Sequence, residues 1–203
     1  MSTVLNLTEI EPVVLHLGPA MKKMTDDEFL ELCRLNEEWR IEMNSDGDLI
    51  IMSPTGLKTG ERNFWLIAEF GAWVDEDDTG VGFDSSTMFT LPNGARRSPD
   101  VAWVRRLRWD ALSEEDRERC GPVCPDFVIE LRSPSDSLKT LQAKMQEYID
   151  NGALLGWLFD PFEKKVHIYR PDSQVELLVQ PQSISGDPVL PGFTLKLSKL
   201  WRD

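Results

Sequence analysis

A single carboxylate interrupts an otherwise apolar run in the segment PDFVIELRSPSD, at residues 125–136. The letters FVIEL predict a buried strand in which every residue except Glu130 is apolar. A carboxylate that loses its water on burial costs free energy unless a cation or a hydrogen-bond donor compensates it. The fold of this chain must therefore bring a partner to Glu130, and few other features of the sequence impose so specific a demand.

Helices and short strands alternate through the chain. The letters TDDE at 25–28 form a capping box that opens a helix, and NSDG between two apolar runs predicts a β-hairpin. The predicted elements begin with a helix to about residue 36, the hairpin, a loop at 55–60 and a helix over 60–77 with Phe64 on its apolar face. Strands follow near 81–84, 86–91, 100–104 and 126–132, with a polar helical excursion between the strands at 100–104 and 126–132. A helix over 138–151 and further strands complete the chain. This order predicts an α/β fold with a mixed central sheet and helices on both faces.

The length and composition fit one domain. We expect a single unit over 1–203, made of an N-terminal helix–hairpin extension (1–55), a core (56–170) and C-terminal strands (171–203). The net charge of −13 disfavours nonspecific attraction to nucleic acid or to anionic membranes. The apolar runs are too short to span a bilayer, the N-terminus lacks the basic region of a signal peptide, and three cysteines indicate no disulfide framework. A cytoplasmic protein without membrane partners is the expectation.

A second carboxylate opens the preceding strand. Asp100 follows a proline in SPDVAWV, and if this strand neighbours the one that carries Glu130, both carboxylates can point at one place. Two carboxylates that approach closely repel each other unless a cation lies between them. Carboxylate oxygens together with water and phosphate are the ligands that Mg²⁺ prefers, and a bound divalent ion activates a phosphodiester toward water.

These residues carry a family resemblance. The Pro-Asp pair at Asp100 and the later Glu-Leu-Arg starting at Glu130 resemble the PD-(D/E)xK nuclease signature. The longer segments PDVAWV, CPDFVIELRSPSDSLKTLQAKMQEYIDNGALLGWLFDP and VHIYRP resemble a bacterial family of restriction-endonuclease-like proteins, long classed as a domain of unknown function. The resemblance runs from the TDDEF helix to LPGFTLKL. It implies a restriction-endonuclease-like fold and a Mg²⁺-dependent endonuclease, with Mn²⁺ as an alternative ion and DNA as the expected substrate.

The resemblance also implies site residues. Asp100 and Glu130 would bind the metal, with the carbonyl of Leu131 and the carboxylate of Glu61 as further ligands. The signature expects lysine where this chain has Arg132, and in the family that lysine has moved to the next helix, which corresponds here to Lys144.

Two arrangements of these cations are open. Either Arg132 points into the site and Lys144 faces solvent, or Lys144 reaches the carboxylates and Arg132 grips phosphate. Lys144 lies on the flank of an apolar helical stripe, so its stem can follow the core toward Glu130. A structural salt bridge of Glu130 with Arg132 or with another arginine is the alternative without catalysis.

A basic run surrounds Asp100. Residues 96–108, RRSPDVAWVRRLR, hold five arginines and one aspartate. We predict that Arg96, Arg97 and Arg105 bind nucleic-acid phosphates together with Arg132; a strand end neutralised by salt bridges is the alternative.

Two classes of function fit this sequence. The first is the metal-dependent endonuclease, with Asp100, Glu130 and Lys144 as its catalytic residues. The second is an inactive relative that serves as a nucleic-acid-binding or protein-interaction module and has no need of metal. By analogy with nucleases that cut two strands, we expect a symmetric homodimer.

Overall fold

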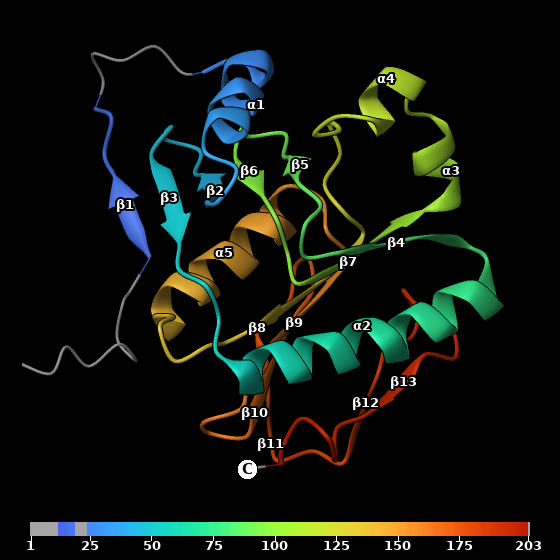
Figure 1. The fold of residues 1–203 in the computed structure, drawn as a ribbon. Coiled ribbons are helices and arrows are strands. Elements are labelled where there is room, and N and C mark those ends of the chain that lie inside the picture. The colour runs from blue at the N-terminus through green and yellow to red at the C-terminus, as the bar shows by residue number, and fades with distance from the viewer. Residues whose placement is uncertain (1–11, 19–23, 203) are drawn as a thin grey trace, which may run out of the picture.

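A mixed six-stranded sheet forms the centre of the molecule, in a computed structural model that describes residues 12–18 and 24–202. Its strand order is β11-β10-β9-β8-β7-β4 (Figure 1). β8 and β9 run parallel, whereas the other neighbouring strands are antiparallel. The strands are β4 (Gly80–Asp84), β7 (Val101–Arg105), β8 (Phe127–Leu131), β9 (Leu155–Asp160), β10 (Lys165–Tyr169) and β11 (Glu176–Val179). The predicted mixed α/β fold is confirmed.

Two long helices cover the opposite faces of this sheet. The strands lie between α2 (Leu57–Asp77) and α5 (Leu138–Asp150) (Figure 1). In β8, Phe127 and Ile129 belong to the core cluster under α2, whereas Val128 belongs to the cluster under α5. Side chains alternate between the faces of a strand, so Glu130 points toward α5.

A second sheet holds the N-terminal part of the described chain. The capping box that opens α1 (Asp26–Leu35) is confirmed, and so is the hairpin of β2 (Arg40–Met43) and β3 (Leu49–Met52). The sheet has the order β1-β3-β2-β6-β5 and includes the unpredicted β1 (Val13–Leu15) and β6 (Arg96–Arg97) besides β5 (Phe89–Thr90). Part of the predicted extension, at 1–11 and 19–23, lies outside the described residues.

The start and the buried face of α2 differ from the prediction. The helix begins at Leu57, inside the predicted loop, because Gly56 adopts an extended conformation and serves as N-cap without a side-chain bond. Phe64 is 76% exposed, whereas the core takes Trp65 and Phe70. The earlier start places the first turns of α2 beside the site described below.

Smaller elements complete the described chain. The polar excursion contains α3 (Arg106–Asp110) and α4 (Glu114–Arg117), as predicted, and the C-terminal part forms a two-stranded sheet of β12 (Ser183–Ser185) and β13 (Thr194–Lys196). None of the helices in the described part of the chain is long and apolar enough to cross a membrane.

Candidate active site

The pairing of β7 with β8 brings the two predicted carboxylates to one place. Val101 lies opposite Ile129 in the antiparallel register, so Asp100 lies beside the end of β8. The Asp100 Oδ2 atom accepts a hydrogen bond from the Leu131 backbone N–H at 2.8 Å. Asp100 and Glu130 line the same pocket, of about 290 Å³, which we call the carboxylate pocket.

Helix α2 contributes an asparagine to this pocket. The Asn63 side-chain amide donates to Asp100 Oδ1 at 3.2 Å. Its oxygen, Oδ1, is buried and has no hydrogen-bond partner among the described residues. Thr59, one turn earlier, lines the same pocket, whereas Glu61 lies on the exposed side of α2. The sequence analysis named Glu61 as the ligand from this helix and passed over Asn63, although Asn63 lies inside the predicted helix at 60–77.

A buried lysine joins two carboxylates that come from different sheets. The Lys144 Nζ atom lies 2.8 Å from Glu130 Oε1 and 2.9 Å from Glu42 Oε1. Tyr148, one turn further along α5, donates its hydroxyl to Glu130 Oε1 at 3.1 Å. Lys144, Glu42 and Glu130 are all at most 7% exposed. The predicted approach of Lys144 to Glu130 is therefore present, and Glu42 is a partner that the sequence analysis did not identify.

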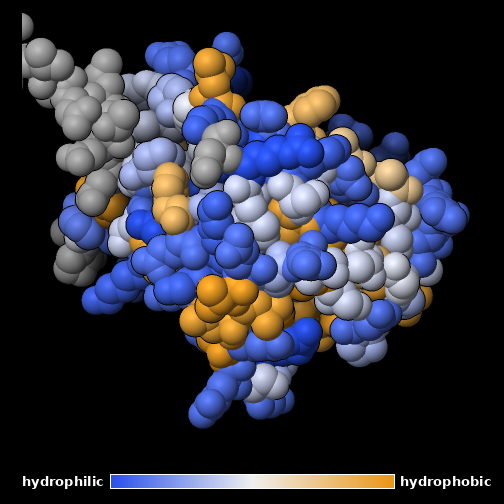
Figure 2. All heavy atoms as spheres, turned by 90° about the horizontal axis from the view of Figure 1, so that it is seen from below, coloured by the Kyte–Doolittle hydropathy of each residue, from blue (hydrophilic) through white to orange (hydrophobic). Residues whose placement is uncertain are grey.

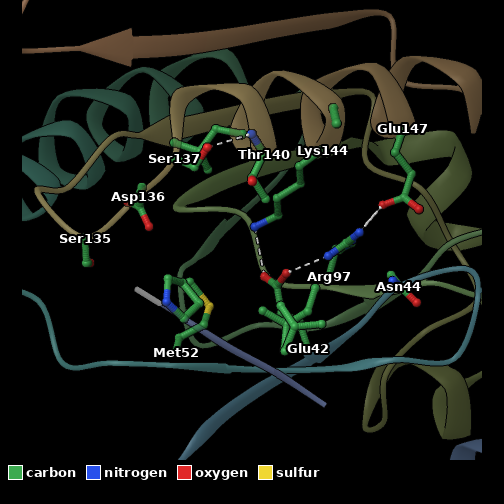
Figure 3. A pocket seen from close by; sticks show the side chains of 15 residues that line it. Glu42, Asn44, Met52, Arg97, Ser135, Asp136, Ser137, Thr140, Lys144 and Glu147 are labelled. Atoms are coloured by element: carbon green, nitrogen blue, oxygen red, sulfur yellow. Dashed lines mark hydrogen bonds and ion pairs between the residues drawn. The ribbon is translucent and has the colours of Figure 1, made fainter. Parts of the chain in front are cut away.

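The charged chain continues beyond Glu42. Arg97 NH1 lies 3.1 Å from Glu42 Oε2, and Arg97 Nε donates to Glu147 Oε2 at 2.6 Å (Figure 3). The backbone N–H of Ser98 donates to Glu42 Oε1 at 3.0 Å. Anionic and cationic groups thus alternate from Glu130 to Glu147, with Lys144 and Arg97 between the carboxylates.

Burial governs the protonation of these groups. Burial raises the pKa of Glu130 to about 8, although Lys144 acts in the opposite direction. Burial also raises the pKa of Asp100, against the hydrogen bond from the Leu131 N–H. Burial would lower the pKa of Lys144, but the negative charges of Glu130 and Glu42 outweigh it and raise that pKa. Lys144 is therefore held as a cation between the two carboxylates in this structure.

Arg132 points away from the carboxylate pocket. Its NH1 atom lies 2.8 Å from Asp160 Oδ2, and its guanidinium lies over the ring of Phe162. Of the two arrangements left open by the sequence, the structure contains the one in which Lys144 reaches Glu130. The predicted part of Arg132 in binding phosphate stays a prediction.

The arginines of the basic run at 96–108 each have a carboxylate neighbour from another part of the chain, and Arg105 and Arg108 share Asp126. Arg96 and Arg97 are buried, and Arg105 is partly exposed. Their role in binding nucleic acid stays a prediction, and none of the three is free of a carboxylate neighbour. The pairs are Arg96–Asp26, Arg97–Glu42, Arg97–Glu147, Arg105–Asp126, Arg106–Asp78 and Arg108–Asp126.

The donors of the carboxylate pocket suit a hard cation. No group of three or more His, Cys, Asp or Glu side chains in the described part of the chain could hold a metal. Mg²⁺ is commonly held by only one or two carboxylates, with water and substrate phosphate completing its six oxygen ligands. Asp100 and Glu130 supply two carboxylates here, and the unpartnered Oδ1 of Asn63 is a neutral oxygen beside them. The residues present therefore fit Mg²⁺ or Mn²⁺.

The fold and this site define a class of protein. A mixed central sheet between two helices is the fold that the sequence resemblance implied for a restriction-endonuclease-like protein. The model of the Uma2 family, described as "Putative restriction endonuclease", matches residues 26–198, and the chain belongs to this family.

A solved structure supports the same fold. The chain is similar to the crystal structure of a "putative nuclease belonging to DUF820" from Anabaena variabilis ATCC 29413. The TM-score is 0.73 at 22% identity, and the match covers 88% of this chain and 97% of that one. A comparison with curated proteins gives no match.

We predict that Lys144→Met destabilises the protein by about 3–5 kcal/mol, because Glu130 and Glu42 would be left as buried carboxylates without their shared cation. Chemical denaturation of the metal-free protein measures this change. The double variant Lys144→Met/Glu130→Gln should recover part of the loss, since one of the two charges is then gone. If the double variant lost as much stability as Lys144→Met and Glu130→Gln lose together, the contact between Lys144 and Glu130 would contribute nothing to stability.

Proposed function

We propose that the protein is a Mg²⁺-dependent endonuclease that hydrolyses phosphodiester bonds, with DNA as the expected substrate. The observation that carries this proposal is the convergence of Asp100 and Glu130 on one pocket, with Lys144 Nζ 2.8 Å from Glu130. Membership in a family described as restriction endonucleases supports it.

The residues divide the chemistry between them. Asp100 and Glu130 would hold Mg²⁺ or Mn²⁺, with the carbonyl of Leu131 and Asn63 Oδ1 as further oxygen ligands. A metal bound there polarises the phosphate and lowers the pKa of a water molecule. Lys144, which stays protonated, stabilises negative charge on the phosphate in the transition state.

Two further groups can receive the substrate phosphate. Arg40 lines the carboxylate pocket at its exposed mouth. The first turn of α2 adds its unpaired backbone N–H groups, because Gly56 gives no side-chain cap and Thr59 of that helix faces the pocket. Arg40 and these N–H groups can bind phosphate at a mouth that Glu38 also lines, while the floor carries Asp100 and Glu130.

A cleavage assay tests the proposed activity. We expect cleavage of DNA in Mg²⁺ or Mn²⁺ and none in EDTA, and Asp100→Ala should lower the rate at least about 100-fold. Lys144→Ala should also remove cleavage but still bind Mn²⁺. Equal cleavage by the wild type and Asp100→Ala would reject the site. Cleavage of RNA but not of DNA would show that the substrate is RNA.

Metal binding distinguishes Asn63 from Glu61, its neighbour on α2. We predict that Asn63→Ala weakens Mn²⁺ binding about 10- to 100-fold, because Asn63 contacts Asp100 and offers a free oxygen. Glu61→Ala is the matched control and should leave the affinity unchanged. Calorimetric titration gives both values. Weaker Mn²⁺ binding by Glu61→Ala and unchanged binding by Asn63→Ala would show that Glu61 is the metal ligand on α2.

The second candidate function is a binding module without catalysis. The observation in its favour is that Lys144 already neutralises Glu130, so the folded chain satisfies its buried carboxylate without metal. This candidate predicts nucleic-acid or protein binding that is the same in Mg²⁺ and in EDTA, and no cleavage under any condition tested.

We also propose that the chain forms a homodimer through the edge strand β11. This strand ends the central sheet, and Val175 just before it and Leu177 and Val179 within it are 42%, 48% and 68% exposed. Figure 2 shows hydrophobic side chains gathered on the lower face of the molecule, toward which β11 lies in Figure 1. Edge strands of this kind pair readily with a second copy.

Light scattering at micromolar concentration tests the dimer. We expect a mass twice the 23.2 kDa of one chain. Leu177→Asp should return it to the monomer value, because the new charge would lie among the apolar side chains of Val175 and Val179 that the second copy would cover. A wild-type protein of monomer mass would contradict the proposal.

A further inference from the structure

A second pocket, of about 370 Å³, adjoins the carboxylate pocket. We call it the side pocket. It lies between α5 and the strands β2 and β3, as Figure 3 shows. The two pockets share a wall, so a strand whose phosphate lies at Asp100 and Glu130 can place the adjoining part of the same nucleotide in the side pocket. The shared residues are Pro12, Met52, Ser135, Asp136 and Leu141.

The side pocket has apolar walls and a neutralised floor. Val14, Ile50 and Leu141 form much of its wall. Its floor consists of Lys144, Glu42, Arg97 and Glu147, whose charges are paired with one another. Such a surface offers little to a phosphate group, but a flat uncharged ring can bury its faces against the apolar side chains. Hydroxyl groups at the rim come from Ser135, Ser137 and Thr140.

The ion pairs of the arginines in residues 96–108 also favour binding through bases. Arg96 and Arg97 are buried in ion pairs, and Arg105 and Arg108 share the carboxylate of Asp126, so little of the run's positive charge is free to follow a duplex backbone. In a chain of net charge −13, more of the affinity must then come from contacts with bases.

We propose that the side pocket receives an unpaired nucleobase of the strand that is cut, so that the substrate is single-stranded or locally unpaired nucleic acid. This inference rests on the proposed nuclease function. A base inside a duplex cannot enter such a pocket without leaving its stack, and that cost is smallest where the base is already unpaired.

The test fills the pocket from α5. Thr140 is exposed and lines the side pocket, whereas its neighbour Lys139 is exposed and does not. Thr140→Trp should therefore occupy the pocket, and Lys139→Trp is the matched control. The probes are a fluorescent single-stranded oligodeoxynucleotide and a strand of the same length in which every base is replaced by an abasic site, both measured by anisotropy with Ca²⁺ in place of Mg²⁺.

We expect the wild type and Lys139→Trp to bind the strand with bases about 5- to 150-fold more tightly than the abasic strand. Thr140→Trp should lose this preference and keep its affinity for the abasic strand. If Thr140→Trp does not fold, Ala143→Trp fills the same pocket from the next turn of the helix.

Two results would overturn the inference. One is equal wild-type affinity for the two strands, and the other is a full base preference in a folded Thr140→Trp or Ala143→Trp. If the wild type still cleaves DNA in Mg²⁺ in either case, the proposed function stands and only the base pocket is rejected. If the wild type neither binds these strands nor cleaves any nucleic acid, the proposed nuclease function is rejected as well.

Discussion

The ion pairs of Lys144 with Glu130 and Glu42 are the interaction on which the site depends. Glu42 comes from the N-terminal sheet and Glu130 from the central sheet, and the lysine reaches both from α5. Removing three charged groups from water is costly, and only their close mutual contact and further hydrogen bonds offset it. The N-terminal hairpin is therefore part of the site rather than an addition to a finished nuclease fold.

This arrangement separates two tasks. Glu42, whose pKa Lys144 and Arg97 hold below its usual value against the effect of burial, stays negative and keeps Lys144 in place. Glu130, which lines the carboxylate pocket together with Asp100, is the carboxylate that would exchange its bond to lysine for a bond to metal in the proposed function. If a metal binds there as proposed, Glu42 would retain the lysine beside the phosphate, where its positive charge would stabilise the transition state.

Much of the fold and part of the site could be predicted from local sequence. The capping box at Thr25, the apolar strand around Glu130 and the flank position of Lys144 are signals within one element, and adjacent strands place Asp100 beside Glu130. Glu42 gave no such signal, because it lies 102 residues from the lysine that it binds.

Other features depended on contacts that local patterns do not contain. The start of α2 was placed too late because Gly56 caps the helix without a side-chain bond. Asn63 lies inside the predicted helix, but its contact with Asp100 joins residues 37 positions apart, and no local pattern shows it. The arginines of 96–108 form a positive cluster in the sequence, but their carboxylate partners come from distant segments such as Asp26, Asp78 and Glu147. Charge read along the chain is therefore a poor guide to charge on the surface.

Anomalous diffraction from crystals soaked in Mn²⁺ tests this account most directly. It predicts one strong peak within ligand distance, about 2.2 Å, of both the Asp100 and the Glu130 carboxylates, with Lys144 Nζ still bonded to Glu42. A peak that contacts neither carboxylate, or none at saturating Mn²⁺ while Lys144 remains bonded to Glu130, would contradict it.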